Sequence, residues 1–408
     1  MTPPILRNQP ARRLFLHLHG LGDLPTGPAT GADLADLIHR IGFVQLDSIN
    51  TVERAHHMIL WSRRQSYRPP ALKRLLEQDR ALFEHWTHDA SVIPVEHYGH
   101  WRHRFERDAV RLQANWRSWF RDGYEDKFDT ILRHVIDHGP VTSTDVGEGE
   151  ARGKGGWWDW HPSKTALEWL WRTGALAVTR RDGFQKVYDL TERVIPAQHR
   201  GAAGDAADMV EWACAAALDR LGFATSGELA AYWRACNPAE AADWCSTALR
   251  HGRLVELVVE AADGSLRRSF AWPDVIDRAT AAPEPPSRIR ILSPFDPALR
   301  DRNRAERLFG FVYRIEVFVP EPKRLFGYYV FPVLEGSRII GRIDAKAIRA
   351  EGVLRIKAFW PEPGVSIGHG RLARLEAELA RLAGFAGCET VEHLAGWLRD
   401  PVRLTPEK

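Results

Sequence analysis

The sequence lacks long apolar runs and cysteine motifs. Its N-terminal apolar stretch, Leu14-Phe15-Leu16, is flanked by Arg13 and His17, and no segment reaches the roughly 20 apolar residues of a membrane-spanning helix. The 4 cysteines are scattered without C-x-x-C spacing, which argues against a structural zinc, an iron–sulfur cluster or a disulfide framework. We therefore expect a soluble protein of the reducing cytoplasm, without a membrane partner.

The sequence also lacks an excess of charge of either sign. Its 56 basic and 53 acidic residues leave a formal net charge of only +3, so a nucleic-acid partner must be argued from where the basic residues lie. The chain has 408 residues, of which 44% are hydrophobic. That length and composition are typical of two to four compact units with buried cores.

Two central segments repeat one order of elements. The first begins with an apolar periodic helix at 128–137 and continues with a capping-box sequence at 142–145. A helix then starts at Pro162 and ends before Gly174, and strands at 175–179 and 184–190 flank a turn at 180–183. This order of helices followed by a hairpin is that of a winged helix.

The second copy runs from Met209 to Trp272 with the same signals. A helix ends near Gly222, a capping box follows at 225–228, and the last helix is bounded by Asn237-Pro238 and Gly252. A hairpin about 262–264 completes the repeat, which predicts tandem winged helices.

The remaining chain divides less regularly. A third copy near 31–84 has weaker signals, and the proline-rich segment 274–290 is typical of a linker. Beyond the linker we predict strands and one helix, at 314–319, 328–334, 338–343, 353–359 and 371–382. The predicted fold class is α+β, with tandem winged-helix (helix-turn-helix) domains and a C-terminal β-rich, barrel-like domain, divided as 1–125, 126–200, 205–275 and 288–408.

The tripeptide Gln45-Leu46-Asp47 lies within an apolar run. In extended backbone, residues i and i+2 point to the same side, so the amide and the carboxylate would face one spot. A carboxylate there polarises a water or faces a developing cation, and an amide orients that water or a base edge. The alternative is a polar kink with a purely structural role.

The sequence around this pair closely resembles the catalytic segment of a known family. From Val44 through His56-His57 to Leu60-Trp61-Ser62-Arg63, it resembles the winged-helix DNA glycosylases that unhook interstrand crosslinks, the YcaQ/AlkZ type. The family has members with a second Gln and members with Asp at the position of Asp47, and this chain is of the Asp kind. Further segments resemble the family in the same order along the chain, namely Lys154-Gly155-Gly156-Trp157-Trp158-Asp159-Trp160-His161-Pro162, Leu292-Ser293-Pro294-Phe295-Asp296-Pro297, Arg304-Ala305-Glu306-Arg307-Leu308-Phe309 and Gly341-Arg342-Ile343-Asp344-Ala345-Lys346.

The resemblance implies a fold with three winged helices and a C-terminal barrel, and a DNA repair activity. The implied reaction is hydrolysis of the N-glycosidic bond of N7-alkylated purines, as crosslinks or monoadducts in double-stranded DNA, to leave an abasic site. Asp47 would act as anion and general base, and Gln45 would hold the water or the lesion edge. We expect a monofunctional glycosylase that acts as a monomer. The alternative is a non-catalytic tandem winged-helix transcription regulator, in which Gln45 and Asp47 are structural.

We consider basic residues as candidates for phosphate contacts, which are sequence-independent and salt-sensitive. They lie on the predicted hairpin, on a helix and in the C-terminal region. A solvated hairpin tip explains some of these charges equally well. The predicted DNA-binding residues are Lys164, Arg180, Arg181, Lys186, Arg302, Arg304, Lys323 and Arg324, with His57 beside the catalytic pair.

We expect no metal ion and no other cofactor. His97, His100 and His103 have a suggestive spacing, but side chains at i, i+3 and i+6 drift around a helix, and no cysteine or carboxylate completes a ligand set. The tryptophans at 157–160 are expected to pack against the protein rather than to stack on bases.

Overall fold

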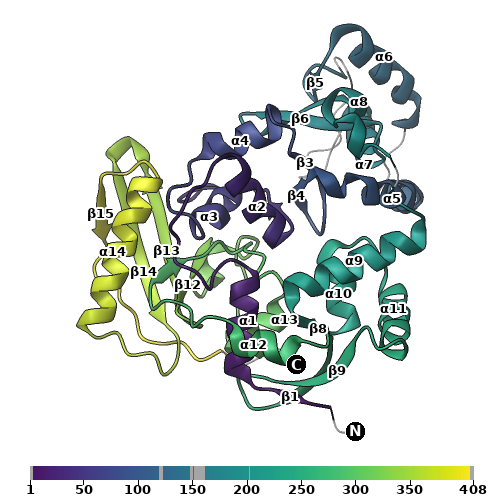
Figure 1. Ribbon diagram of the computed structural model, residues 1–408. Coiled ribbons are helices and arrows are strands. Elements are labelled where there is room, and N and C mark those ends of the chain that lie inside the picture. Colours follow the sequence, from purple (N-terminus) through teal and green to yellow (C-terminus); the bar gives the residue numbers. More distant parts are fainter. Residues whose placement is uncertain (1–2, 119–122, 148–149, 151–160, 202, 405–408) are drawn as a thin grey trace.

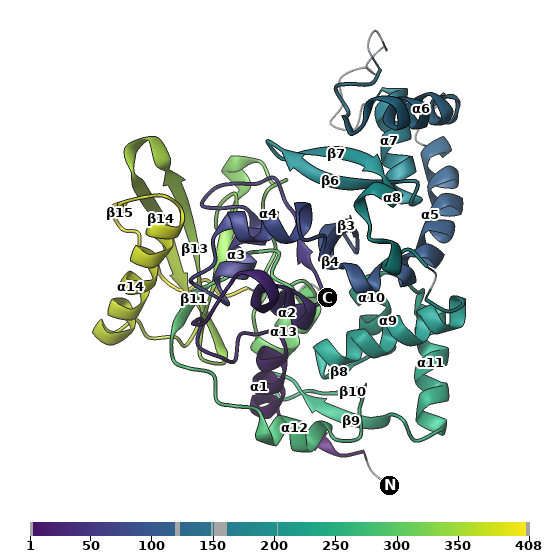
Figure 2. The same ribbon diagram turned by 45° about the horizontal axis from the view of Figure 1, so that its top comes forward.

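The structure is a computed structural model that describes residues 3–118, 123–147, 150, 161–201 and 203–404. Three units with a common order of elements are joined to a C-terminal sheet (Figure 1). In both views the first unit lies between the C-terminal sheet and the other two units (Figure 2). No helix in the described part of the chain is long and apolar enough to span a membrane.

The first unit carries the Gln45-Leu46-Asp47 segment. Helix α2 buries one apolar face at i, i+3, i+4 and i+7 and ends at Gly42, whose φ is 81°. A Cβ at Gly42 would lie 2.8 Å from the Trp233 ring, so glycine permits close packing on the third unit. The unit comprises α2 (Gly31–Ile41), β2 (Val44–Gln45), α3 (Ala55–Trp61), α4 (Pro69–Glu77), β3 (Leu82–Trp86) and β4 (Ala90–Pro94), and its strands form an antiparallel sheet in the order β2-β4-β3.

The second unit contains the hairpin predicted to carry DNA-contacting residues. It comprises α6 (Phe128–His138), β5 (Val141–Thr142), α7 (Pro162–Arg172), β6 (Leu176–Asp182), β7 (Gln185–Leu190) and α8 (Thr191–Val194). The prediction that residues 180–183 form the turn was wrong, because Arg180 and Arg181 belong to β6 and the turn is Gly183-Phe184. Both turn residues have positive φ, 55° and 75°, which matches the twist of a two-residue hairpin.

The capping-box sequence at 142–145 does not begin a helix in the described residues. The Thr142 backbone N–H donates to the Asp145 carboxylate at 2.8 Å, and the Thr144 N–H donates to the Thr142 hydroxyl at 3.2 Å. These bonds close a turn after β5, since Ser, Thr and Asp side chains stabilise local turns as well as helix caps.

The third unit follows the sequence prediction closely. Its helices begin at capping boxes formed by Asp205, Thr225 and Asn237. The N-terminal strand β1 (Ile5–Leu6) extends its sheet beside β9, and α1 (Asn8–Leu18) packs against α9, α12 (Val275–Ala281) and α13 (Arg302–Phe309). The unit comprises α9 (Ala206–Leu221), β8 (Phe223–Ala224), α10 (Ser226–Trp233), α11 (Pro238–Arg250), β9 (Val255–Glu260) and β10 (Leu266–Ala271).

A long helix, α5 (Tyr98–Ser118), joins the first unit to the second and contacts α7 and α9. Short 3₁₀ helices lie at η1 (Val95–His97), η2 (Glu125–Lys127) and η3 (Ala197–His199). The predicted linker 274–290 is not wholly irregular, because it contains α12, which covers α1 (Figure 1).

The C-terminal sheet has the order β11-β12-β13-β14-β15, and α14 packs against it. Its edge strands β11 and β15 do not pair with each other, so the described sheet is an open half-barrel. The predicted strand at 314–319 does not form, because the Glu316 carboxylate accepts the backbone N–H groups of residues 325–327 and closes a loop. The elements are β11 (Ile289–Ile291), η4 (Glu321–Lys323), β12 (Val330–Glu335), β13 (Arg338–Ile348), η5 (Arg349–Glu351), β14 (Val353–Pro361), α14 (His369–Phe385) and β15 (Thr390–His393).

Candidate active site

Gln45 and Asp47 lie at the end of β2, opposite the turn between β3 and β4. Strand pairing places Gln45 opposite Ser91, and the Leu46 N–H donates to the Ala90 carbonyl at 2.8 Å. This register brings the turn residues His88 and Asp89 onto the Gln45 side chain. The backbone pairing of the first unit therefore builds the site from residues more than 40 positions apart.

The Gln45 amide is held at both ends. Its Oε1 lies 2.9 Å from His88 Nε2, and its Nε2 donates to Asp89 Oδ2 at 3.2 Å. Burial, with Arg300 as the largest charge contribution, lowers the pKa of His88 to about 2. A neutral His88 that donates from Nε2 fixes the orientation of the amide. One N–H of Gln45 then remains to hold an acceptor such as a water oxygen.

Asp47 is half-buried, and its orientation is set by its own backbone. Its Oδ1 accepts the Ile49 N–H at 2.7 Å. Burial raises the pKa of Asp47, the Ile49 N–H opposes that rise, and the negative charge of Asp89 adds to it. Burial also raises the pKa of Asp89. Asp89, which also bonds to Gln45, therefore lies close enough to influence the ionisation of Asp47.

The third unit and the C-terminal region complete the surroundings. Arg300 Nη1 lies 3.1 Å from His88 Nδ1 and donates to the Tyr232 carbonyl at 2.6 Å. Tyr329 is buried nearby, and its pKa is raised first by burial, with a further contribution from the charge of Asp47. The site thus lies where three parts of the chain meet. It offers a carboxylate and an amide N–H donor of fixed orientation.

The sequence analysis missed His88, Asp89 and the role of Arg300. A His-Asp pair between two strands has the composition of an ordinary turn, so only the pairing of β2 with β4 reveals that both residues contact Gln45. The basic character of Arg300 was visible, but its partner His88 lies 212 positions away.

If the protein catalyses the glycosidic hydrolysis that the resemblance implies, Asp89→Asn is expected to move the acid limb of its pH–rate profile to lower pH. Asp47 must be ionised to act as a base, and Asp89 raises the Asp47 pKa, so removal of that charge keeps Asp47 ionised at lower pH. Single-turnover rates across a pH series measure the limb. Asp33→Asn, at an exposed position on α2, is the control and should leave the limb in place. An unmoved limb in Asp89→Asn would show that Asp89 has only a structural role.

The hairpin of the second unit turns two of its predicted DNA-contacting residues toward protein. Arg181 forms a bidentate ion pair with the buried Glu84, at 2.6 and 2.8 Å. Lys186 Nζ lies 2.5 Å from Oε1 of the buried Glu168. Among the described residues, Arg180 has the exposed Asp182 as its one ionic partner, and its own side chain is 42% exposed. Of these three residues, Arg180 is the one on the protein surface.

Two predicted DNA-contacting residues of the C-terminal region also have internal partners. Arg304 is 3% exposed and donates to the Leu221 and Phe223 carbonyls at 2.8 and 2.9 Å. Arg302 donates to two backbone carbonyls, at 2.7 and 2.9 Å. Arg304 thus joins α13 to the third unit, whereas Arg302 stabilises the segment that precedes α13.

The other predicted contacts lie nearer the surface. Lys323 is exposed, and Arg324 is half-buried with its guanidinium 5.1 Å from the Tyr328 ring centre. Lys164 lies in the first turn of α7 and is half-buried. His57 Nδ1 is 2.8 Å from the Tyr67 hydroxyl, and burial with Arg54 lowers the pKa of His57 to about 4. A neutral imidazole brings no charge to a phosphate at pH 7.

The histidines considered for a metal site contact aromatic and backbone groups. His100 stacks on Trp212 at 4.3 Å between ring centres, His97 lies beside Trp233, and His103 Nε2 is 3.0 Å from the Gly204 carbonyl. No group of three potential metal ligands occurs among the described residues. The tryptophans at 157–160 lie outside the described residues.

The arrangement of elements matches that of a protein of known structure. A solved structure, "Streptomyces sahachiroi DNA glycosylase AlkZ", matches with a TM-score of 0.60 and 15% sequence identity, over 98% of this chain and 100% of that chain. At this identity the match shows the shared α+β fold. Residues 38–385 match the family model described as DNA glycosylase AlkZ-like. The chain belongs to the AlkZ-like DNA glycosylase family, and it is a DNA glycosylase.

Family membership decides between the two functions left open by the sequence. It supports a DNA repair enzyme rather than a non-catalytic transcription regulator.

Proposed function

We propose that this protein is a monofunctional DNA glycosylase for N7-alkylated purines, as monoadducts or interstrand crosslinks in double-stranded DNA. The observation that carries the proposal is the Gln45 amide held between His88 and Asp89, with the half-buried Asp47 carboxylate two residues further on and within electrostatic range of Asp89. An N7-alkylpurine is already cationic, so it leaves without protonation. The enzyme then needs an anion facing the sugar and a positioned water, and these two residues supply both.

The proposed reaction uses one carboxylate and one amide. Departure of the base leaves positive charge on the sugar, which the Asp47 carboxylate stabilises. The remaining Gln45 N–H holds the water oxygen, and Asp47 takes the proton as that oxygen bonds to the anomeric carbon. The products are the neutral alkylated base and an abasic site. We propose that the protein acts as a monomer, in the cytoplasm, on DNA.

We further propose that the three units are winged helices, because each shows a helix, a short strand, a further helix and a hairpin in that order. An alkylated base tethered to the opposite strand cannot rotate into a deep pocket, so an open DNA-binding surface suits a crosslink better. The exposure of Lys323 and of the Arg180 side chain supports both as phosphate contacts. Lys164 and Arg324 are half-buried, and Arg324 donates to the Val319 carbonyl at 2.8 Å, so we leave both out of that set. We also leave out Arg181, Lys186, Arg302, Arg304 and His57, because their side chains have internal partners.

The expected product is an abasic site in an unbroken strand. Lys186 is the lysine whose charge acts on Asp89, and its ammonium is paired with Glu168 rather than free to form a Schiff base. Purified protein is incubated with duplex containing N7-methylguanine, and the strand is analysed before and after heating in alkali. N7-methylguanine is itself heat- and alkali-labile, so a sample without enzyme is the control. Cleavage after heating that exceeds this control, with none before heating, supports the proposal, and cleavage equal to the control contradicts it. Borohydride trapping of a covalent adduct would indicate a lysine nucleophile instead.

A further inference from the structure

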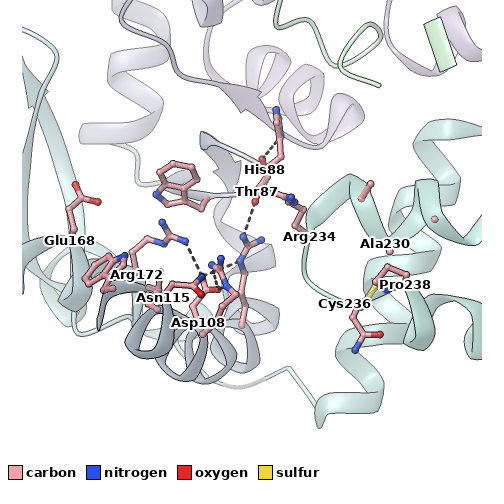
Figure 3. A pocket seen from close by; sticks show the side chains of 18 residues that line it. Thr87, His88, Asp108, Asn115, Glu168, Arg172, Ala230, Arg234, Cys236 and Pro238 are labelled. Carbon is pink, nitrogen blue, oxygen red and sulfur yellow. Dashed lines mark hydrogen bonds and ion pairs between the residues drawn. The ribbon is translucent and has the colours of Figure 1, made fainter. Parts of the chain in front are cut away.

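A cavity of about 740 Å³ lies beside the active-site turn, between the second and third units. Figure 3 shows Asp108 and Arg172 on one wall, Ala230, Cys236 and Pro238 on the other, and Thr87, His88 and Arg234 between them. Thr87 and His88 line the cavity, and His88 and Asp89 hold Gln45 from the other side of the same turn. Whatever occupies the cavity therefore lies next to the reacting nucleotide.

The lining carries an excess of positive charge. Four arginines stand against two carboxylates, Asp108 and Glu168, an excess of two. The Glu168 charge is neutralised by Lys186, whose Nζ lies 2.5 Å from Glu168 Oε1. Asp108 is shared by three arginines, with Arg111 at 2.7 Å and Arg104 and Arg172 each at 3.6 Å. A cavity of this charge attracts an anion.

Arg234 is the cationic residue placed to meet that anion. It caps α10 in the left-handed conformation, with φ 53° and ψ 32°, which a residue other than glycine rarely adopts. Its side chain is exposed, and its guanidinium has no hydrogen bond or ion pair within the part of the chain that the structure describes. Its charge lowers the pKa of His88, after burial and Arg300, and Figure 3 shows it beside Thr87 and His88.

The aromatic groups of the cavity do not suit a stacked base. Arg172 covers the Trp86 ring at 4.5 Å, and Trp116 packs edge-on against Tyr124 and Trp169, at 5.6 and 5.7 Å between ring centres. The Arg111 side chain also lines the cavity and is 52% exposed, although it is paired with Asp108. Charge without a free aromatic face favours a phosphate over a nucleobase.

We propose that this cavity is a phosphate site, in which Arg234 binds one backbone phosphodiester of the damaged strand within about two nucleotides of the lesion. The site rests on the proposed function and deepens it, because it fixes the strand beside Gln45 and Asp47. Arg234 donates to the phosphate oxygens, and Arg111 and Arg172 supply the surrounding positive potential. Phosphate contacts position DNA without reading its sequence.

The test replaces single phosphates by neutral methylphosphonates. Duplexes carry 2′-fluoro N7-methylguanine, in which the fluorine slows glycosidic cleavage, and one methylphosphonate at each position from three nucleotides 5′ to three nucleotides 3′ of the lesion. Fluorescence anisotropy at fixed salt gives the affinity of the wild-type protein, Arg234→Gln and Arg250→Gln. Arg250 is the matched control, since it is exposed in the same unit at the far end of α11 from Pro238.

The wild-type protein is expected to lose affinity by about 5- to 10-fold at a position within two nucleotides of the lesion, as for a charge-assisted hydrogen bond. Arg234→Gln should lose a similar factor on the natural backbone and show no further loss at that position, whereas Arg250→Gln keeps the wild-type profile. Equal profiles for wild-type and Arg234→Gln would overturn the phosphate site. Excision of 2′-deoxy N7-methylguanine from an unsubstituted duplex is measured in parallel, and failure of the wild-type protein there would contradict the proposed function itself.

Discussion

Asp47→Asn is expected to lower the single-turnover rate of N7-methylguanine excision by about 10²- to 10⁴-fold, the range of a positioned general base. Asparagine keeps the size of the side chain and can still accept the Ile49 N–H, which lies 2.7 Å from Oδ1. Folding and duplex affinity should therefore stay near wild type. What is lost is the anion that stabilises the sugar cation and takes the proton from water.

The pH dependence of the wild-type enzyme provides a check on this assignment. Because burial raises the pKa of Asp47, the rate should fall, as the pH is lowered, at a higher pH than for a solvated aspartate. Gln45→Ala should slow excision by less than Asp47→Asn, and the double variant should be less impaired than the product of the two effects, since both act on one water. Excision by Asp47→Asn at the wild-type rate would return the pair to a structural role.

The second large effect is on stability. Asp296→Ala is expected to lower the free energy of unfolding by about 3–5 kcal/mol, because it leaves the Arg63 charge buried without a partner. Both side chains are 0% exposed, and their two hydrogen bonds measure 2.7 and 2.8 Å. The pair ties the end of α3 to the segment that follows β11, so it fixes the first unit against the C-terminal region. Urea denaturation of wild type and variant measures the loss.

A surface ion pair provides the comparison. Asp182→Ala removes the ionic partner of Arg180. The Asp182 side chain is 54% exposed and the Arg180 side chain 42%, so the free energy of unfolding should change by less than about 1 kcal/mol. Equal losses for Asp182→Ala and Asp296→Ala would contradict the importance assigned to burial. Replacing both Arg63 and Asp296 by apolar residues should recover part of the lost free energy of unfolding, because no unpaired charge then remains buried.

The buried Arg63–Asp296 pair also gives a structural role to one of the segments that resemble the family. Leu292-Ser293-Pro294-Phe295-Asp296-Pro297 was identified as similar to the family, but the sequence assigned it no role. In the structure Asp296 accepts from Arg63 and from the Ala298 N–H at 3.0 Å. Arg63 itself belongs to the first matching segment, so the two segments meet in the core although they lie 233 positions apart.

Local signals predicted most helices. Pro162, Asn237-Pro238 and Gly222 mark helix ends where the structure has them, because capping and proline effects depend on only a few neighbouring residues. Prediction failed where a distant group decided the backbone. The Glu316 carboxylate turned an expected strand into a loop, and α12 formed within a proline-rich segment where it packs on α1.

The sequence by itself determined the family, the repeated order of elements and the Gln45–Asp47 pair, since each is written in contiguous residues. Tertiary structure alone decided what surrounds that pair. The register of β2 on β4 brought His88 and Asp89 to Gln45, and burial beside Glu84 and Glu168 drew Arg181 and Lys186 away from the surface. Ion pairs and strand registers join residues far apart in the chain, so no local pattern of residue types encodes them.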